Sequence, residues 1–239
     1  MKNLIVANWK SNPTTVKEAK GIFKGIKVGI KKFDSEVVVC PPFVYLPLLK
    51  GLALGAQDCF YEDKGAFTGK VSAPMLKELG VEYVILGHSE IRKIGETDEV
   101  INKKIKKALE AGLKIIFCVG ETAEERDAGK KNEVLERQIK QGLAGIDRLE
   151  GVNIAYEPVW AIGTGNNCSV EETGSSIEFI KKESALSGAE GQKVRVLYGG
   201  SVKSENSGAY IKEAGANGLL VGGASLNAEE FSKIVKSAE

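Results

Sequence analysis

Eight short apolar runs recur along this chain, and helical patterns separate most of them. The runs are continuous rather than alternating, which is typical of strands in a parallel sheet that is covered on both faces. They span Leu4–Ala7, Val37–Cys40, Leu52–Ala56, Val81–Leu86, Lys114–Val119, Val152–Tyr156, Val194–Tyr198 and Gly218–Val221. Eight strand–helix units without an interruption favour a closed (β/α)8 barrel over an open α/β sheet. No linker or low-complexity tract divides the chain, so we expect one domain over residues 1–239.

Polar pairs at capping distance predict where several helices begin. They are Thr15 with Glu18, Thr122 with Glu125, Ser169 with Glu172, and Asn227 with Glu230. Apolar stripes with helical spacing follow the first and last pairs: Val16, Ala19, Phe23, Ile26 and Ile30, then Phe231, Ile234 and Val235. A further stripe of Ile101, Ile105, Ala108 and Leu109 ends before Gly112, which is typical of a helix C-terminus.

Composition excludes several classes of function. The 33 basic and 32 acidic residues leave a net charge of +1, so nothing indicates a nucleic-acid or membrane partner. The four cysteines lack CxxC spacing and the chain has one histidine, which argues against a zinc site. Cys40 and Cys118 lie inside apolar runs, which predicts small core residues. The Leu4–Ala7 run is too short for a signal peptide, so we expect a protein of the reducing cytoplasm.

In such a barrel the functional site lies at the carboxyl ends of the strands. The sixth run ends in YEPVWAIGTG, from Tyr156 to Gly165, which places Glu157 directly after a strand and before Pro158. A segment with a Gly163–Gly165 tip follows. A fixed carboxylate beneath a movable segment suits proton transfer that must be protected from water. A glutamate in the first turn of a helix is the alternative.

Two more polar side chains follow predicted strands. Lys10 comes just after the first run, where it can offer positive charge to an anionic substrate or be an ordinary surface lysine. His88 follows the fourth run at a strand-to-helix turn, where backbone N–H groups of the next helix can point at one ring nitrogen. Such donors favour a neutral imidazole, which can donate its remaining proton to a substrate oxygen. A structural, hydrogen-bonded histidine is the other interpretation.

Glycine pairs follow the last two runs. Gly199–Gly200 and Gly222–Gly223 stand where loops after the seventh and eighth strands commonly bind phosphate in this architecture. Glycines there let the backbone approach a ligand, and N–H groups at a short helix start suit an anion. Tight turns explain glycine pairs equally well.

Taken together, these residues resemble the triosephosphate isomerase family over nearly the whole length. The resemblance rests on ANWK at Ala7–Lys10, CPPF near Cys40, GAFTG at Gly65–Gly69, GHSE at Gly87–Glu90, CVGE at Cys118–Glu121, YEPVWAIGTG, YGGS and GLLVGG. It implies interconversion of dihydroxyacetone phosphate and D-glyceraldehyde 3-phosphate through an enediolate, with neither metal nor organic cofactor. A different sugar-phosphate barrel and a binding barrel without turnover are the alternatives.

The resemblance also implies a role for each site residue. Glu157 is the base, and His88 is the electrophile that polarises the carbonyl. Lys10 supplies positive charge for the phosphate and the enediolate, Asn8 adds a hydrogen bond, and Glu90 pairs with Lys10. Phosphate binding, mainly through backbone N–H groups, is implied for Gly163, Ser201, Gly222 and Gly223.

Three positions depart from the family pattern. Asn166-Asn167-Cys168 replaces the usual Lys-Thr-Ala at the second lid hinge, so lid kinetics are the property in doubt. Lys70 replaces an acidic residue and Ile91 replaces an arginine. In the family these two can form an ion pair between subunits. We therefore predict a homodimer through the Gly65–Gly69 loop that lacks this ion pair.

Overall fold

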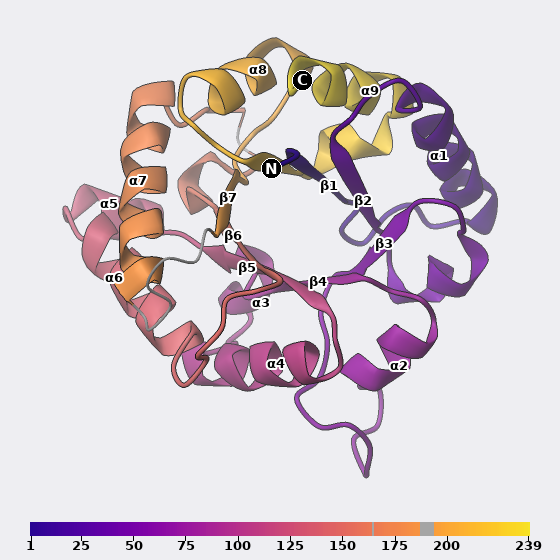
Figure 1. Ribbon diagram of the computed structural model, residues 1–239, viewed down its shortest axis with the longest axis horizontal. Helices are drawn as coiled ribbons and strands as arrows, with labels where there is room; N and C mark the ends of the chain where they lie inside the picture. The colour runs from indigo at the N-terminus through magenta and orange to yellow at the C-terminus, as the bar shows by residue number, and fades with distance from the viewer. Residues whose placement is uncertain (164, 187–193) are drawn as a thin grey trace.

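Eight parallel strands close into a barrel in the computed structural model, which describes residues 1–163, 165–186 and 194–239 (Figure 1). Each strand pairs with the next along the chain, and β8 returns to pair with β1, placing Leu4 opposite Gly218. The strands are β1 Leu4–Asn8, β2 Glu36–Cys40, β3 Ala53–Ala56, β4 Tyr83–Leu86, β5 Lys114–Val119, β6 Val152–Tyr156, β7 Arg195–Tyr198 and β8 Gly218–Val221. The predicted (β/α)8 barrel is confirmed.

The strands are apolar on both faces because each face is covered. On β1, Leu4 and Val6 belong to a buried cluster that fills the barrel, together with Cys40 and Cys118. Ile5 and the other alternate residues pack instead in the layer between the barrel and the helices. Cys40 and Cys118 are fully buried free thiols, as predicted for small core residues.

Helices surround the barrel as an outer ring (Figure 1). The α-helices of the described residues are α1 Val16–Gly29, α2 Ala73–Glu78, α3 Ser89–Lys93, α4 Asp98–Glu110, α5 Ala123–Asp127, α6 Lys131–Gly142, α7 Val170–Leu186, α8 Ser204–Lys212 and α9 Ala228–Ser237. Short 3₁₀ helices are η1 Phe43–Leu48, η2 Val159–Ala161 and η3 Gly223–Leu226. Among the helices of these residues, none combines the length and apolarity needed to cross a bilayer.

The predicted helix starts are confirmed by their caps. At α5, Thr122 Oγ1 accepts the Glu125 N–H and the Glu125 carboxylate accepts the Thr122 N–H, which is a complete capping box. Asn227 Oδ1 caps α9 by accepting the N–H groups of Glu229 and Glu230. These side chains satisfy N–H groups that have no partner within the helix, so they fix where the helix begins.

A polar network closes the amino-terminal end of the barrel, opposite the strand ends predicted to carry chemistry. Glu36 at the start of β2 accepts hydrogen bonds from Tyr83 and, at 2.7 Å, from Arg195 Nη1. Lys114 Nζ lies 3.3 Å from the same carboxylate, and Arg195 Nε donates to Asn153 Oδ1 at 2.7 Å. Burial acts to raise the pKa of Glu36, but the bonds from Tyr83 and Arg195 and the nearby charges outweigh it and lower the pKa to about 2.

Glu36→Gln is expected to destabilise the protein at neutral pH by about 1–2 kcal/mol, because charge-assisted bonds to Arg195 are lost. The pKa of Glu36 is depressed in the folded state, so its stabilisation is present above the ordinary carboxyl value and is lost as the pH falls toward 2. Urea unfolding of the variant and the parent should therefore differ at pH 7, and the difference should shrink below the ordinary carboxyl pKa and vanish only as the pH falls through about 2. Glu82→Gln, at an exposed carboxylate just before β4, is the matched control. Equal stabilities of the Glu36 variant and the parent at pH 7 would contradict the prediction.

Candidate active site

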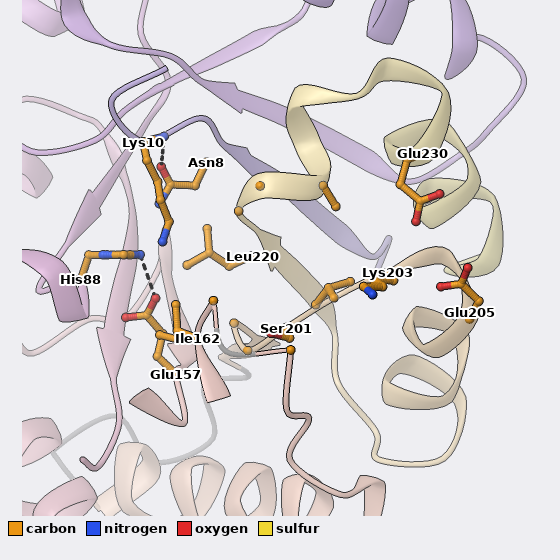
Figure 2. Close-up of a pocket in the computed structure, with 18 residues that line it drawn as sticks. Asn8, Lys10, His88, Glu157, Ile162, Ser201, Lys203, Glu205, Leu220 and Glu230 are labelled. Carbon is orange, nitrogen blue, oxygen red and sulfur yellow. Dashed lines mark hydrogen bonds and ion pairs between the residues drawn. The ribbon is translucent and has the colours of Figure 1, made fainter. Parts of the chain in front are cut away.

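A cavity of about 530 Å³ opens at the carboxyl ends of the strands. Figure 2 shows side chains from distant parts of the chain converging on it. Its lining includes most of the predicted site residues: Asn8, Lys10, His88, Glu157, Gly163, Ser201, Gly222 and Gly223. The remaining one, Glu90, is not part of the lining but contacts Lys10. The fold thus assembles in one place residues that are up to 215 positions apart, from Asn8 to Gly223.

Glu157 follows β6 and is held at both its backbone and its carboxylate. Its N–H donates to the Val119 carbonyl at 2.8 Å, which continues the β5–β6 ladder by one residue. Its Oε2 accepts the Ser89 N–H at 2.9 Å, and its Oε1 lies 3.0 Å from His88 Nε2. The residue is only 2% exposed, so the carboxylate lies in a site from which bulk water is largely excluded.

His88 lies at the N-cap of α3, directly opposite Glu157 in the cavity (Figure 2). Its Nδ1 accepts the Glu90 N–H at 3.2 Å, which is the type of donor expected at a strand-to-helix turn. A ring that accepts at Nδ1 carries its proton on Nε2, and this N–H points at the Glu157 carboxylate. The geometry therefore presents an N–H donor and a carboxylate to the same cavity.

The two groups shift each other's pKa in opposite directions. Burial acts to lower the pKa of His88, but the negative charge of Glu157 and its hydrogen bond outweigh burial and raise the pKa above the ordinary value. Burial acts to raise the pKa of Glu157, but the contact with His88, the Ser89 N–H and the charge of Lys10 hold it below the ordinary value. Glu157 is consequently an anion at neutral pH, the state in which a carboxylate can accept a proton. The raised pKa of His88 depends on Glu157 staying beside it.

Lys10 is the one described residue other than glycine with a left-handed backbone, at φ 52°. Its N–H donates to Asn8 Oδ1 at 3.0 Å, and its carbonyl accepts from Gln57 Nε2 at 2.8 Å. Lys10 Nζ donates to Glu90 Oε1 at 2.6 Å. Such a conformation costs free energy and persists only when the surroundings enforce it. The two amide side chains provide that restraint and aim the ammonium group into the cavity.

Gln57 was not among the residues predicted to belong to the site. It stands directly after β3, so the rule that polar residues at carboxyl strand ends serve the site was a usable signal. What it contacts, two backbone carbonyls at Lys10 and Cys40, has no sequence signature.

The glycines after β7 and β8 line the same cavity, and Figure 2 shows the adjacent Ser201 on the side of the cavity away from His88. A Cβ added at Gly222 would lie 3.4 Å from Lys10 Cε, so the absence of a side chain there lets the lysine pass close to the backbone. A Cβ at Gly223 would meet no atom within 4 Å, which leaves its backbone open to a ligand. Ser201 Oγ donates to the Ala161 carbonyl, so this loop also contacts the segment after Glu157.

The segment predicted to act as a lid is described except for Thr164, which lies outside the described residues. Trp160 Nε1 and the Tyr156 hydroxyl both donate to Glu121 Oε1, at 2.8 and 3.2 Å. Burial raises the pKa of Glu121 despite these bonds. At the second hinge, the Cys168 carbonyl accepts the Tyr210 hydroxyl at 2.8 Å. Both ends of the segment are therefore bonded to the barrel.

Within the described ranges, no group of three or more His, Cys, Asp or Glu side chains is arranged to hold a metal ion. The polar side chains that line the cavity include the Glu157 carboxylate, the His88 imidazole, the Lys10 ammonium and the Asn8 amide, and the lining continues to Ser201, Lys203, Glu205 and Glu230. This set can move a proton and stabilise negative charge.

Comparison with known proteins adds an independent observation. A sequence model of the family described as "Triosephosphate isomerase" matches residues 3–238. The chain belongs to the triosephosphate isomerase family. Triosephosphate isomerase of Aquifex aeolicus is 47% identical over 246 aligned residues, covering 99% of this chain and 100% of that protein. The enzyme of Carboxydothermus hydrogenoformans is 48% identical over 249 residues, with 99% of each chain covered. That of Alkaliphilus oremlandii is 45% identical, with 98% of each covered.

Proposed function

We propose that this chain interconverts dihydroxyacetone phosphate and D-glyceraldehyde 3-phosphate, with Glu157 as the base and His88 as the electrophile. The observation that carries the proposal is the 3.0 Å contact between Glu157 Oε1 and His88 Nε2 in a cavity that also contains Lys10. Residues 1–239 then act as one catalytic domain. The family match over residues 3–238 disfavours a different sugar-phosphate barrel.

The reaction begins with movement of the base. Glu157 rests on the Ser89 N–H and on His88 Nε2, so it must leave both to reach a carbon-bound proton of the substrate. Its departure exposes the Nε2–H of His88, which can then donate to the substrate carbonyl. It also removes the charge that raises the pKa of His88, and this favours the neutral ring. One displacement thus prepares both groups.

Proton transfer then proceeds without a net change in protonation. Glu157 takes a proton from one carbon, and the bonding electrons form the enediolate while His88 protonates the carbonyl oxygen. His88 next takes the hydroxyl proton from the neighbouring oxygen, and Glu157 returns its proton to the adjacent carbon. Lys10, held by Glu90, stabilises the negative charge of the enediolate and the phosphate.

The phosphate lies, in this proposal, at the glycine-rich end of the cavity. Backbone N–H groups of Gly163, Ser201, Gly222 and Gly223 are the donors, and Asn8 adds a hydrogen bond near the reacting carbons. Closure of the segment that contains Gly163 excludes water, which protects an enediolate that would otherwise expel phosphate.

A coupled assay on D-glyceraldehyde 3-phosphate tests the function. This family is a standard example of diffusion-limited catalysis, so we expect kcat/KM on the order of 10⁸ M⁻¹s⁻¹. Turnover of other sugar phosphates alone would favour a different sugar-phosphate barrel enzyme. Absence of any turnover would favour a binding protein.

A homodimer through the Gly65–Gly69 loop is also part of the proposal. The loop projects beyond the ring of helices (Figure 1), and its Phe67 side chain is 41% exposed. Phe67 packs against Phe60, with ring centroids 5.0 Å apart, so the conformation of the projecting tip is fixed by contacts within the chain. An exposed aromatic side chain on such a tip is a suitable anchor for a partner subunit.

Phe67→Asp is expected to convert the dimer to a monomer. Light scattering should give twice the 25.6 kDa chain mass for the parent and the single-chain mass for the variant. Val28→Asp, at a residue 60% exposed on α1, is the control and should remain dimeric. A monomeric parent with full activity would contradict the homodimer.

The cytoplasm is the proposed location. All four cysteines are buried free thiols, which is compatible with a reducing compartment.

A further inference from the structure

Arg92 on α3 joins three separate parts of the structure through one guanidinium group. Its Nε donates to the Gly87 carbonyl at 2.7 Å, and its Nη2 donates to the Cys118 carbonyl at 3.2 Å. Its Nη1 forms an ion pair with Asp98 at the start of α4. The side chain is 17% exposed, so these contacts form largely away from solvent.

The two carbonyls belong to backbone segments that hold the two proposed catalytic residues in place. Gly87 immediately precedes His88, so its carbonyl is part of the peptide unit that carries the imidazole. Cys118 immediately precedes Val119, whose carbonyl accepts the Glu157 N–H at 2.8 Å. Arg92 therefore links the backbone of His88 to β5, the strand whose Val119 carbonyl accepts the Glu157 N–H.

We propose that Arg92 is a positioning residue that sets the separation and orientation of His88 and Glu157 from behind the site. The inference rests on the roles proposed above for those two residues. Arg92 touches neither the cavity nor, in this proposal, the substrate; it acts through the two carbonyls. A displacement of about 1 Å at a catalytic group can cost about 100-fold in rate. Loss of the contacts that hold these two residues should therefore lower the rate measurably.

The shape of the contact explains why arginine is required. Gly87 has φ 72°, and a Cβ there would lie 3.1 Å from Arg92 Nη2, so the guanidinium packs closely on bare backbone. Its planar fork sends donors in three fixed directions, to two carbonyls and one carboxylate. A lysine ammonium is a single point with a flexible stem and cannot serve all three acceptors in this geometry.

The same network provides a matched control. Asp98 is 8% exposed and also lies 3.5 Å from Arg137 Nε. Arg137 is half exposed and approaches the carboxylate from another helix, α6. Arg137→Lys alters an arginine that contacts the same aspartate without disturbing the bonds to Gly87 and Cys118.

Arg92→Lys is expected to lower kcat by about tenfold or more while KM changes by less than about threefold. The reason is that His88 and Glu157 move relative to each other, whereas the residues proposed to bind phosphate are not affected. Arg137→Lys should leave both constants at the parent values. Both variants are made without a histidine tag, in the full chain.

The single histidine permits a second readout that a purely structural role would not change. Ring ¹⁵N signals come only from His88, so NMR reports its tautomer and titration directly. We expect Arg92→Lys to shift the Nδ1 signal, since the Glu90 N–H bond depends on where the ring is held, and to move the pH midpoint. Arg137→Lys should reproduce the parent spectrum.

An Arg92→Lys protein with a lower Tm but with parent kcat and parent ring signals would overturn the proposal. Should that variant fail to fold, Asp98→Asn releases the guanidinium while leaving its donors in place. The same direction of change in kcat and in the ring signals is then expected, and parent values for both would again overturn it. A parent without turnover would contradict the proposed function instead, while the ring signals would still test Arg92.

Discussion

Glu157→Asp is expected to lower the turnover number by at least about 100-fold while the barrel remains folded. The shorter side chain withdraws the carboxylate by about one C–C bond, and misplacement on that scale costs about two orders of magnitude. The backbone bond from Glu157 to Val119 is unaffected by the change, so the strand end should stay in place. Steady-state assays in both directions measure the effect.

Two variants make the result specific. Glu157→Gln keeps the side-chain length and removes the base, so its activity should be at least as low; positioned general bases contribute about 10²–10⁴-fold. Glu133→Asp shortens an exposed carboxylate on α6 and should have no effect. Circular dichroism verifies that each variant folds. Parent-like turnover in Glu157→Asp would remove Glu157 as the base.

The strands could be predicted because a strand that is buried on both faces appears in the sequence as a continuous run of apolar residues. Their boundaries do not follow from the same signal, because apolar character extends beyond the hydrogen-bonded ladder. Val81 shows why: it is 1% exposed, but its N–H donates to Leu76 in α2 rather than to a neighbouring strand. β4 therefore begins at Tyr83, although the apolar run begins at Val81.

Parts of the candidate site were predictable for a different reason. A barrel brings all carboxyl strand ends to one mouth, so knowing the topology was enough to group Lys10, His88 and Glu157. The chemical surroundings were not predictable in the same way. Gln57 and Arg92 donate to backbone carbonyls of residues 5 to 47 positions away, and a carbonyl is present at every residue. Side-chain identity therefore does not reveal which carbonyl is used.

His88→Gln is expected to reduce the turnover number by roughly 10²–10³-fold, the usual loss for one electrostatic stabiliser of a developing oxyanion. The amide N–H can still donate toward the substrate carbonyl, but an amide does not release and regain a proton as an imidazole does. Both functions proposed for His88 are therefore weakened, and the loss should appear mainly in kcat.

The pH profile gives the same variant a second, signed prediction. His88 is among the groups that hold the pKa of Glu157 down against burial, which acts to raise it. Replacing His88 removes an interaction that lowers the pKa of Glu157, while the effect of burial, which raises it, remains. The pKa of Glu157 should therefore rise. Because kcat/KM reports the free enzyme, its acid limb should shift to higher pH. An unchanged limb, together with parent turnover, would make His88 a structural histidine.

Combining the two substitutions tests whether the pair acts as a unit. Residues in direct contact that serve one chemical step rarely give additive losses. Glu157 Oε1 and His88 Nε2 are 3.0 Å apart, so the variant carrying both Glu157→Gln and His88→Gln should be little slower than the slower single variant. Fully multiplicative losses would mean that the two side chains contribute independently, which would contradict the proposed proton-transfer step that they share.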